Sequence, residues 1–191
     1  MVEFVKHTPD TAPAGSRPLL EESQKNVGMI PGLHAIMAES PEALQAYKQL
    51  HGLFKQSSLG TVETHVVWLT LNVYHECHYC VPAHTALAKM DKVPDDVIAA
   101  LREDRPLADP RLETLRSFAK ALADKRGQVD EAEVQAFLEA GFTKRNLLDL
   151  YVGLAQKVMS NYINHVAETP LDEPFKKFDW TPPGKAARAA E

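Results

Sequence analysis

The two cysteines of this sequence lie three residues apart, and a histidine follows the second one after four residues. Cys77, Cys80 and His84 thus occupy positions i, i+3 and i+7. If residues 77 to 84 lie on one helix, both sulfurs and the imidazole point the same way. Two thiols in a first helical turn can reach disulfide geometry, and the unpaired N–H groups there favour a thiolate. We therefore expect thiol–disulfide chemistry at this pair, with His84 accepting or delivering the proton.

Two side chains on the preceding apolar segment are further candidates for the proton route. Glu63 and His65 would lie beside the cysteine turn if the two helices pack antiparallel. A hydrogen-bonded core histidine is an equally good interpretation of His65. Both therefore join Cys77, Cys80 and His84 as candidate catalytic residues.

Two other interpretations of the cysteine pair compete with redox chemistry. The thiols can be small buried apolar groups without reactivity. They can also bind zinc, because Cys77, Cys80 and His84 together with one further histidine make a tetrahedral set, the fourth ligand being His65, His75 or His78. Structural zinc sites usually take their ligands from separated pairs, whereas this cluster is compact. We therefore expect no bound metal and no cofactor.

The elements that would position these side chains are all helices. Pro82 sets the start of the cysteine helix, because a proline in mid-helix loses a hydrogen bond, so this helix should begin near Cys77 to Tyr79. Capping residues and apolar periodicity predict the other helices. The expected ranges are 19–27, 43–55, 61–74, 77–90, 95–102, 110–126, 131–140 and a last helix that follows Thr143. No strand pattern is present, so the predicted fold class is all-α.

The two ends of the chain differ from this helical body, although 191 residues fit one domain spanning 1–191. Residues 1–18 form an expected N-terminal arm rich in proline. Residues 170–191 form an expected C-terminal arm that docks on a neighbouring chain through aromatic anchors, namely Phe175, Phe178 and Trp180. The last helix should bury one apolar face in the core or at an interface, carrying Leu147, Leu150, Leu154, Val158 and Ile163.

Composition and charge exclude several functions. The sequence is 45% hydrophobic and 25% charged with a formal net charge of −5, which argues against nucleic acid and anionic membrane surfaces as partners. The longest apolar stretch, Val66 to Tyr74, is too short to cross a bilayer. The N-terminus lacks the pattern of a secretory signal, so we expect a cytoplasmic protein.

The stretch from His65 to His84 resembles the core of the carboxymuconolactone decarboxylase superfamily, in the branch of alkyl hydroperoxide reductase D-like proteins. The shared pattern is Cys-x-x-Cys-x-x-x-His after a long apolar helix. The segment from Ser160 to His165 and the tail that begins Pro170-Leu171-Asp172 also look like the peroxidase-related members of this branch.

The resemblance implies a multi-helix bundle of that type and a homo-oligomer, either a dimer, a trimer or a hexamer. It implies that Cys80 attacks a hydroperoxide substrate, that Cys77 resolves the intermediate and that His84 takes part in a proton relay. An external thiol or dithiol would then reduce the disulfide. The family pattern has a glutamate twelve residues before the first cysteine, where this chain has His65. Either His65 replaces that carboxylate or the relay is impaired, and Glu63 lies two residues away.

The predicted function is therefore a cofactor-free thiol peroxidase with an antioxidant role. The alternative is a non-catalytic oligomer that senses redox state or binds a partner through the same disulfide. Lactone decarboxylation is a third hypothesis, suggested by the superfamily name alone, and the intact cysteine pair speaks against it. Repeated turnover of peroxide separates the enzyme from the sensor.

Overall fold

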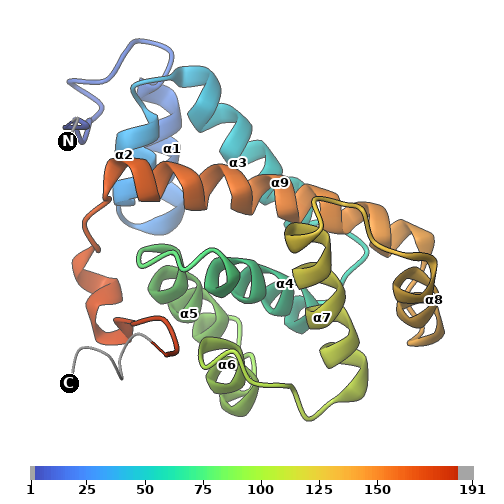
Figure 1. Cartoon of the computed structure of the whole chain (residues 1–191). Helices are drawn as coiled ribbons and strands as arrows, with labels where there is room; N and C mark the ends of the chain where they lie inside the picture. The colour runs from blue at the N-terminus through green and yellow to red at the C-terminus, as the bar shows by residue number, and fades with distance from the viewer. Residues whose placement is uncertain (1–2, 185–191) are drawn as a thin grey trace.

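A computed structural model describes residues 3–184, and this part of the chain is helical without any strand (Figure 1). The predicted all-α class is confirmed. In chain order the elements are α1 (Arg17–Val27), α2 (Gly32–Met37), α3 (Pro41–Lys55), α4 (Thr61–Tyr74), α5 (Cys80–Met90), α6 (Asp95–Arg102), α7 (Pro110–Asp124), α8 (Glu131–Glu139), α9 (Lys144–Ala167) and the 3₁₀ helix η1 (Glu173–Phe178).

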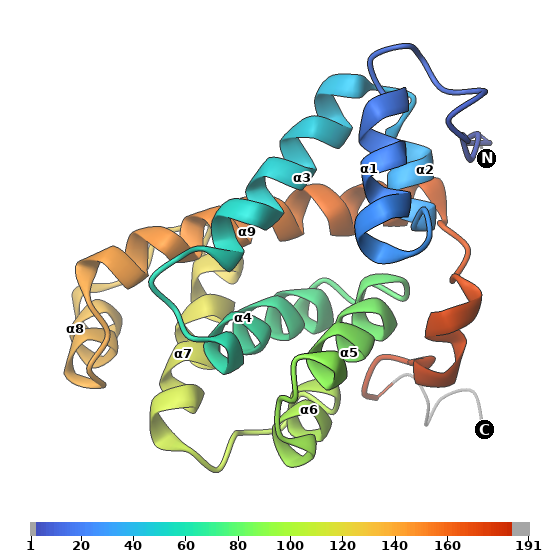
Figure 2. The ribbon, with the colours of Figure 1, turned by 180° about the vertical axis from the view of Figure 1, so that it is seen from behind.

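Helix α4 lies at the centre of the molecule. It packs against α5, α6, α7 and α9, and every residue from Thr64 to Val73 is buried. Figures 1 and 2 show it enclosed between α9 on one side and the α5–α6 pair on the other. A helix that is apolar on most of its surface can only be stable in such a position. The predicted range 61–74 and its burial are both confirmed.

Helix starts follow the capping signals of the sequence. The Ser40 hydroxyl accepts from the Ala43 N–H at 3.2 Å, and Asp109, Asp130 and Thr143 cap α7, α8 and α9 in the same way. Helix α2 was not predicted. It has six residues and no capping side chain, so it offers neither a start signal nor enough length for a periodic pattern.

Helix α9 runs across the whole molecule (Figure 1). Of the five apolar residues expected to form its buried face, Leu150 is buried, and Leu147, Leu154 and Ile163 pack partly buried against the core. The residues that it buries towards its C-terminal end are polar, namely Gln156, Lys157, Ser160, Asn161 and Asn164. Its packing against α3 is close, because a Cβ atom on Gly153 would lie 2.7 Å from the Cζ atom of Phe54.

Both terminal arms fold back onto their own chain. In the N-terminal arm the His7 N–H donates to the Ala35 carbonyl at 3.0 Å. The C-terminal arm forms η1 against α5, and the Trp180 indole N–H donates to the Arg102 carbonyl at 2.8 Å. In the described part of the arm the three aromatic anchors are half-buried on their own chain, and docking on a neighbouring chain stays a prediction. Residues 1–2 and 185–191 of the expected arms lie outside the described range.

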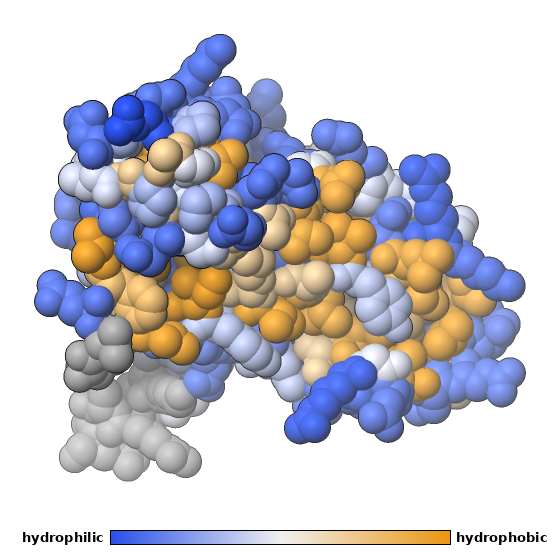
Figure 3. Space-filling model, turned by 90° about the horizontal axis from the view of Figure 1, so that it is seen from above, coloured by the Kyte–Doolittle hydropathy of each residue, from blue (hydrophilic) through white to orange (hydrophobic). Residues whose placement is uncertain are grey.

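Apolar side chains also gather on the surface. Figure 3 shows them as a band across the face seen from above. The exposed large apolar residues of α9 are Leu148, Tyr151, Tyr162 and Val166. Within the described part of the chain, no helix has both the length and the apolar character needed to span a membrane.

Candidate active site

The two cysteines lie in the tight connection between α4 and α5. Helix α4 ends at Tyr74, Glu76 adopts a left-handed conformation with φ 52°, and the Cys77 N–H donates back to the Asn72 carbonyl at 3.0 Å. Helix α5 begins at Cys80, so Cys77 precedes it and Cys80 is its first residue. Pro82 falls in the first turn, where its missing N–H is not needed. The predicted start near Cys77 to Tyr79 is confirmed to within one residue.

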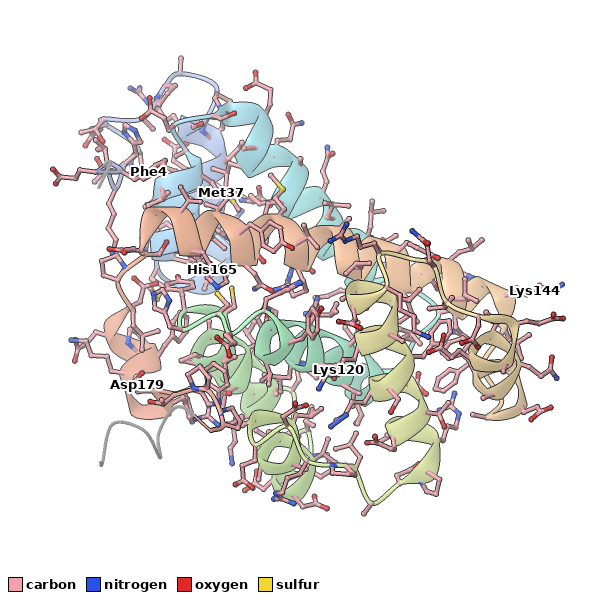
Figure 4. All side chains as sticks on the ribbon, in the orientation of Figure 1. Phe4, Met37, Lys120, Lys144, His165 and Asp179 are labelled. Carbon is pink, nitrogen blue, oxygen red and sulfur yellow. The ribbon has the colours of Figure 1, made fainter. Side chains whose placement is uncertain are left out.

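Both sulfurs are buried and close together. The residues Cys77 and Cys80 are 0% and 2% exposed and carry free thiols. The backbone N–H of Cys80 donates to the Sγ atom of Cys77 at 3.3 Å. Buried apolar side chains of α1, α2 and α3 form one cluster with this pair, namely Leu20, Leu33, Met37, Leu44 and Tyr47. Asn164 of α9 contacts Cys80. Figure 4 shows all side chains of the described residues on the ribbon.

The surroundings make Cys80 the acidic thiol of the two. Burial raises the pKa of Cys80, but the hydrogen bond from the Cys77 thiol and the positive charge of Lys157 outweigh it and lower the pKa to about 6. The amides of Asn161 and Asn164 act in the same direction, and Asn164 Nδ2 lies 3.2 Å from Cys80 Sγ. The surroundings therefore favour the thiolate form of Cys80 over that of Cys77.

Cys77 is the neutral partner of this thiolate. The hydrogen bond to Cys80, burial and the charge of Cys80 all raise the pKa of the Cys77 thiol. Its proton is thus retained while it stabilises the neighbouring anion. The pair therefore holds one reactive sulfur and one protonated sulfur in contact.

His84 does not act on the sulfurs directly in this arrangement. It lies on α5, is 4% exposed, and its Nε2 atom is 2.7 Å from the Nζ atom of Lys157. Burial, followed by the charge of Lys157, lowers the pKa of His84 well below its ordinary value. The neutral ring therefore accepts a hydrogen bond from the lysine ammonium, and its own proton sits on Nδ1.

Lys157 is the residue that sequence analysis missed. It is 0% exposed on α9, and burial lowers its pKa to about 8 against the opposing effect of the two cysteines. Lys157, Asn161 and Asn164 are spaced i, i+4 and i+7, so they share one helix face. This polar periodicity within an apolar helix was the available signal, but charged residues on helices are usually solvated.

A second set of buried amides holds the three helices together at the site. The Asn161 amide donates to Asn72 Oδ1 at 2.9 Å, and the Asn72 amide donates to the Cys80 carbonyl at 3.4 Å. The His75 ring donates through Nδ1 to Asn161 Oδ1 at 2.8 Å. These contacts connect α9 to the ends of α4 and α5 and so fix the position of the cysteine turn.

His65 and Glu63 occupy different surroundings. The His65 Nε2 atom lies 2.8 Å from Asp91 Oδ2, and burial lowers the pKa of His65 although Asp91 partly opposes this. The indole of Trp68 packs against both His65 and His84, with ring centroids 5.3 and 5.0 Å apart. His65 thus reaches the cluster from the side of Asp91, whose side chain is 38% exposed.

Glu63 belongs to the start of α4 instead. Its carboxylate caps the Gly60 N–H at 2.7 Å and pairs with Arg111. About 16 Å of helix separates Glu63 from the end of α4 at Tyr74. The structure therefore does not bring Glu63 to the thiols. In addition, residues 3–184 contain no cluster of three or more His, Cys, Asp or Glu side chains arranged to hold a metal ion.

Comparisons with known proteins agree with this architecture. Residues 41–121 match the sequence profile of the carboxymuconolactone decarboxylase family. No curated protein matches the sequence. The crystal structure of an alkylhydroperoxidase AhpD core, an uncharacterized peroxidase-related protein from Ralstonia eutropha JMP134, superposes with a TM-score of 0.77 at 24% identity, covering 91% of this chain and 93% of that one.

Two further solved structures share the fold. An uncharacterized peroxidase-related protein from Silicibacter sp. TM1040 has a TM-score of 0.76 at 20% identity, with 91% of this chain and 92% of that chain covered. A Cys-to-Ala variant of the debrominase Bmp8, in complex with 2,3,4-tribromopyrrole, has a TM-score of 0.74 at 14% identity, with 93% and 95% covered. The same fold therefore serves proteins described by different activities.

Proposed function

We propose that this chain, whose residues 41–121 belong to the carboxymuconolactone decarboxylase family, reduces hydroperoxides through a Cys77–Cys80 dithiol/disulfide cycle. The observation that carries the proposal is the different surroundings of the two adjacent free thiols: the Asn164 amide donates to Cys80 Sγ at 3.2 Å, whereas the Cys80 backbone N–H donates to Cys77 Sγ at 3.3 Å. The pKa of Cys80 is lowered to about 6, whereas that of Cys77 is raised. A two-step reduction needs this combination of one thiolate to attack and one thiol to resolve.

The proposed cycle has three balanced steps. The Cys80 thiolate attacks one oxygen of the hydroperoxide, so that an S–O bond forms, the O–O bond breaks, and the alkoxide leaves as the alcohol after taking a proton. Cys77 then attacks the sulfenic acid at Cys80, forming the disulfide and releasing water. An external thiol or dithiol reduces the disulfide and is itself oxidised.

Burial of the pair limits what can react. Because both cysteines are almost fully enclosed, we expect hydrogen peroxide and short alkyl hydroperoxides to react faster than bulky ones. No cofactor takes part in this cycle. The dependence on a pool of reducing thiols is consistent with a cytoplasmic location, which we also propose.

The first test is peroxide consumption in the presence of dithiothreitol. Cys80→Ser and Cys77→Ser should each abolish turnover, whereas His165→Ala, a change at an exposed histidine of α9, should leave it unchanged. Wild-type protein that forms the disulfide once and then stops would support the redox-sensing alternative. Removal of bromide from 2,3,4-tribromopyrrole without peroxide turnover would favour the activity for which Bmp8 is named.

The same assay tests the proton route. If His65 relays protons, His65→Ala should lower the turnover number by a factor of about 10² or more. Glu63→Gln should leave it unchanged, because Glu63 caps the start of α4. A large loss in Glu63→Gln with normal stability would contradict this placement.

The expected homo-oligomer remains a prediction. The exposed apolar residues of α9, Leu148, Tyr151, Tyr162 and Val166, form the surface on which a second copy would bury apolar area. Light scattering should give a mass in solution that is a multiple of the 21.2 kDa chain mass. The Tyr162→Lys variant should have a smaller mass in solution. A monomer at micromolar concentration would contradict the prediction.

A further inference from the structure

Lys157 is fully buried, and no carboxylate among residues 3–184 pairs with it. The ion pairs found within residues 3–184 use other cations, with Lys6, Lys48, Lys89, Lys120, Lys125 and Lys176 as the lysine members. Burying an ammonium group without a counter-charge costs several kcal/mol in unfolding free energy. A lysine in this position therefore requires either neutralisation or an anion nearby.

Among the described residues, the groups around Lys157 contain only one kind of anion. The titratable groups that face Lys157 come from α3, from α5 and from the turn between α4 and α5. They are His51 on α3, His75 and Cys77 in the turn, and Cys80 and His84 on α5. The histidines are neutral or positive in every state. Only a cysteine thiolate can therefore balance the ammonium charge.

We propose that Lys157 is the proton carrier of the thiol cycle, paired as an ammonium with the Cys80 thiolate in the reduced protein and neutral beside the disulfide in the oxidised one. Three geometric facts support this. Lys157 shares a helix face with Asn164, whose Nδ2 atom lies 3.2 Å from Cys80 Sγ. Its Nζ atom donates to His84 Nε2 at 2.7 Å, and it has no exposed surface through which water could solvate the charge.

The proton balance of the cycle closes with this assignment. In the reduced state the site holds a thiolate, a thiol and an ammonium. Attack on the hydroperoxide transfers the ammonium proton to the leaving alkoxide, and disulfide formation transfers the Cys77 proton to the departing hydroxide. The products are the disulfide, a neutral amine, an alcohol and water. Reduction by a dithiol returns two protons, one to Cys77 and one to Lys157. Only the step in which the Cys80 thiolate attacks the hydroperoxide rests on the proposed peroxidase function.

His84 acts through Lys157 in this mechanism. Its Nε2 atom accepts a hydrogen bond from the ammonium and orients the remaining N–H groups. It is therefore a positioning residue rather than the group that exchanges a proton with sulfur. The direct relay role that the family resemblance implies for His84 passes to the lysine.

The thiolate itself provides the first test, because its absorbance near 240 nm is measurable without turnover. Wild-type reduced protein should titrate with a midpoint of about 6. Lys157→Met removes the charge at similar volume and should raise the midpoint by about 1–3 pH units. Lys48→Met is the matched control, because Lys48 is 16% exposed on its side chain and pairs with Glu22, so its midpoint should equal that of the wild type. An unchanged midpoint in folded Lys157→Met overturns the proposal.

A second measurement uses wild-type protein alone and does not depend on whether the variant folds. The oxidant diamide takes two electrons and two protons when it converts a dithiol to a disulfide. At pH 7 in weak buffer, Cys77 should supply one proton and Lys157 the other, so no net proton should be taken from solvent. Uptake of one proton per disulfide would show that Lys157 stays charged and would overturn the proposal.

These outcomes separate the inference from the function on which its peroxide step rests. A shifted midpoint and zero proton uptake in a protein without peroxide turnover would support the Lys157 assignment and contradict the peroxidase proposal. Peroxide turnover together with an unchanged thiolate midpoint in Lys157→Met would support the peroxidase proposal and contradict the Lys157 assignment.

Discussion

Helices α4 and α9 cross the same core and use it in opposite ways. Helix α4 buries every residue from Val66 to Val73, and all of them are apolar except Thr70 and Asn72. Helix α9 buries polar side chains towards its C-terminal end and leaves four large apolar residues exposed, Leu148, Tyr151, Tyr162 and Val166. The two helices contact each other along the site.

This difference indicates that stability and chemistry are divided between the two helices. Burying apolar surface stabilises the fold, whereas burying an amide or an ammonium costs free energy unless a partner compensates. The inner face of α9 is therefore unfavourable for folding by itself. Lys157 and Asn164 find their partners in His84 and Cys80, whereas Gln156 bonds to Trp68 and His51, and Asn161 bonds to Asn72 and His75.

The largest expected effect on stability lies on α4. Leu69 is 0% exposed in the core, so Leu69→Ala should lower the free energy of unfolding by about 2–5 kcal/mol. In Leu69→Ala the midpoint of the Cys80 thiolate titration should stay at the wild-type value. Arg145→Ala on α9, at an exposed position outside the proposed oligomer surface, should change stability by less than about 0.5 kcal/mol. Chemical denaturation of both variants measures this, and equal losses would remove the distinction between the helices.

The next effect concerns the place where α9 approaches α3. In Gly153→Ala the added Cβ would lie 2.7 Å from the Phe54 ring, and the resulting shift should cost about 1–3 kcal/mol of unfolding free energy. Gly52→Ala is the control, because no atom lies within 4 Å of its added Cβ. In mid-helix this change should stabilise the protein by about 0.5–1 kcal/mol. Stabilisation by Gly153→Ala would show that the contact between the helices is adaptable.

The same two helices show how far sequence analysis reached. The range and burial of α4 were predictable, because an apolar stretch of this length has one stable location. The spacing of Cys77, Cys80 and His84 made them candidates. In the structure the two cysteines contact each other, and His84 contacts Lys157. Helix starts at Pro41, Pro110, Glu131 and Lys144 followed from their caps.

The inner face of α9 could not be predicted by the same rules. Periodicity identifies a buried face by its apolar residues, and here that rule selects Leu154 and Val158, which are half-buried. Lys157 becomes understandable only when a helix more than sixty residues away in sequence supplies His84 and Cys80. The contact of the C-terminal arm with α5 likewise depends on tertiary packing that no local pattern encodes.

The pH dependence of Cys80 alkylation and of peroxide reduction separates two roles at the site, formation of the thiolate and supply of a proton by α9. Because the pKa of Cys80 is lowered to about 6, its thiolate is present above that pH and lost below it. Alkylation by a small reagent should fall about tenfold per pH unit below 6 and stay level above it. Peroxide reduction should also decline above about 8, where Lys157, its pKa lowered by burial, loses its proton. An alkylation midpoint between 8 and 9 would contradict the lowered pKa.

The smallest effect should come from a single amide on the inner face of α9. Asn164 donates to Cys80 Sγ at 3.2 Å, and its Oδ1 atom is buried without a hydrogen-bond partner among the described residues. Asn164→Leu keeps the volume and removes a hydrogen bond from a neutral amide to the thiolate, worth about 1.5 kcal/mol, so the Cys80 midpoint should rise by about one pH unit. Ser160→Ala, on the same buried face, should not move it. Since a charge acts more strongly than a neutral amide at the same sulfur, a shift in Asn164→Leu as large as that in Lys157→Met would mean that hydrogen bonding, and not the lysine charge, holds the thiolate.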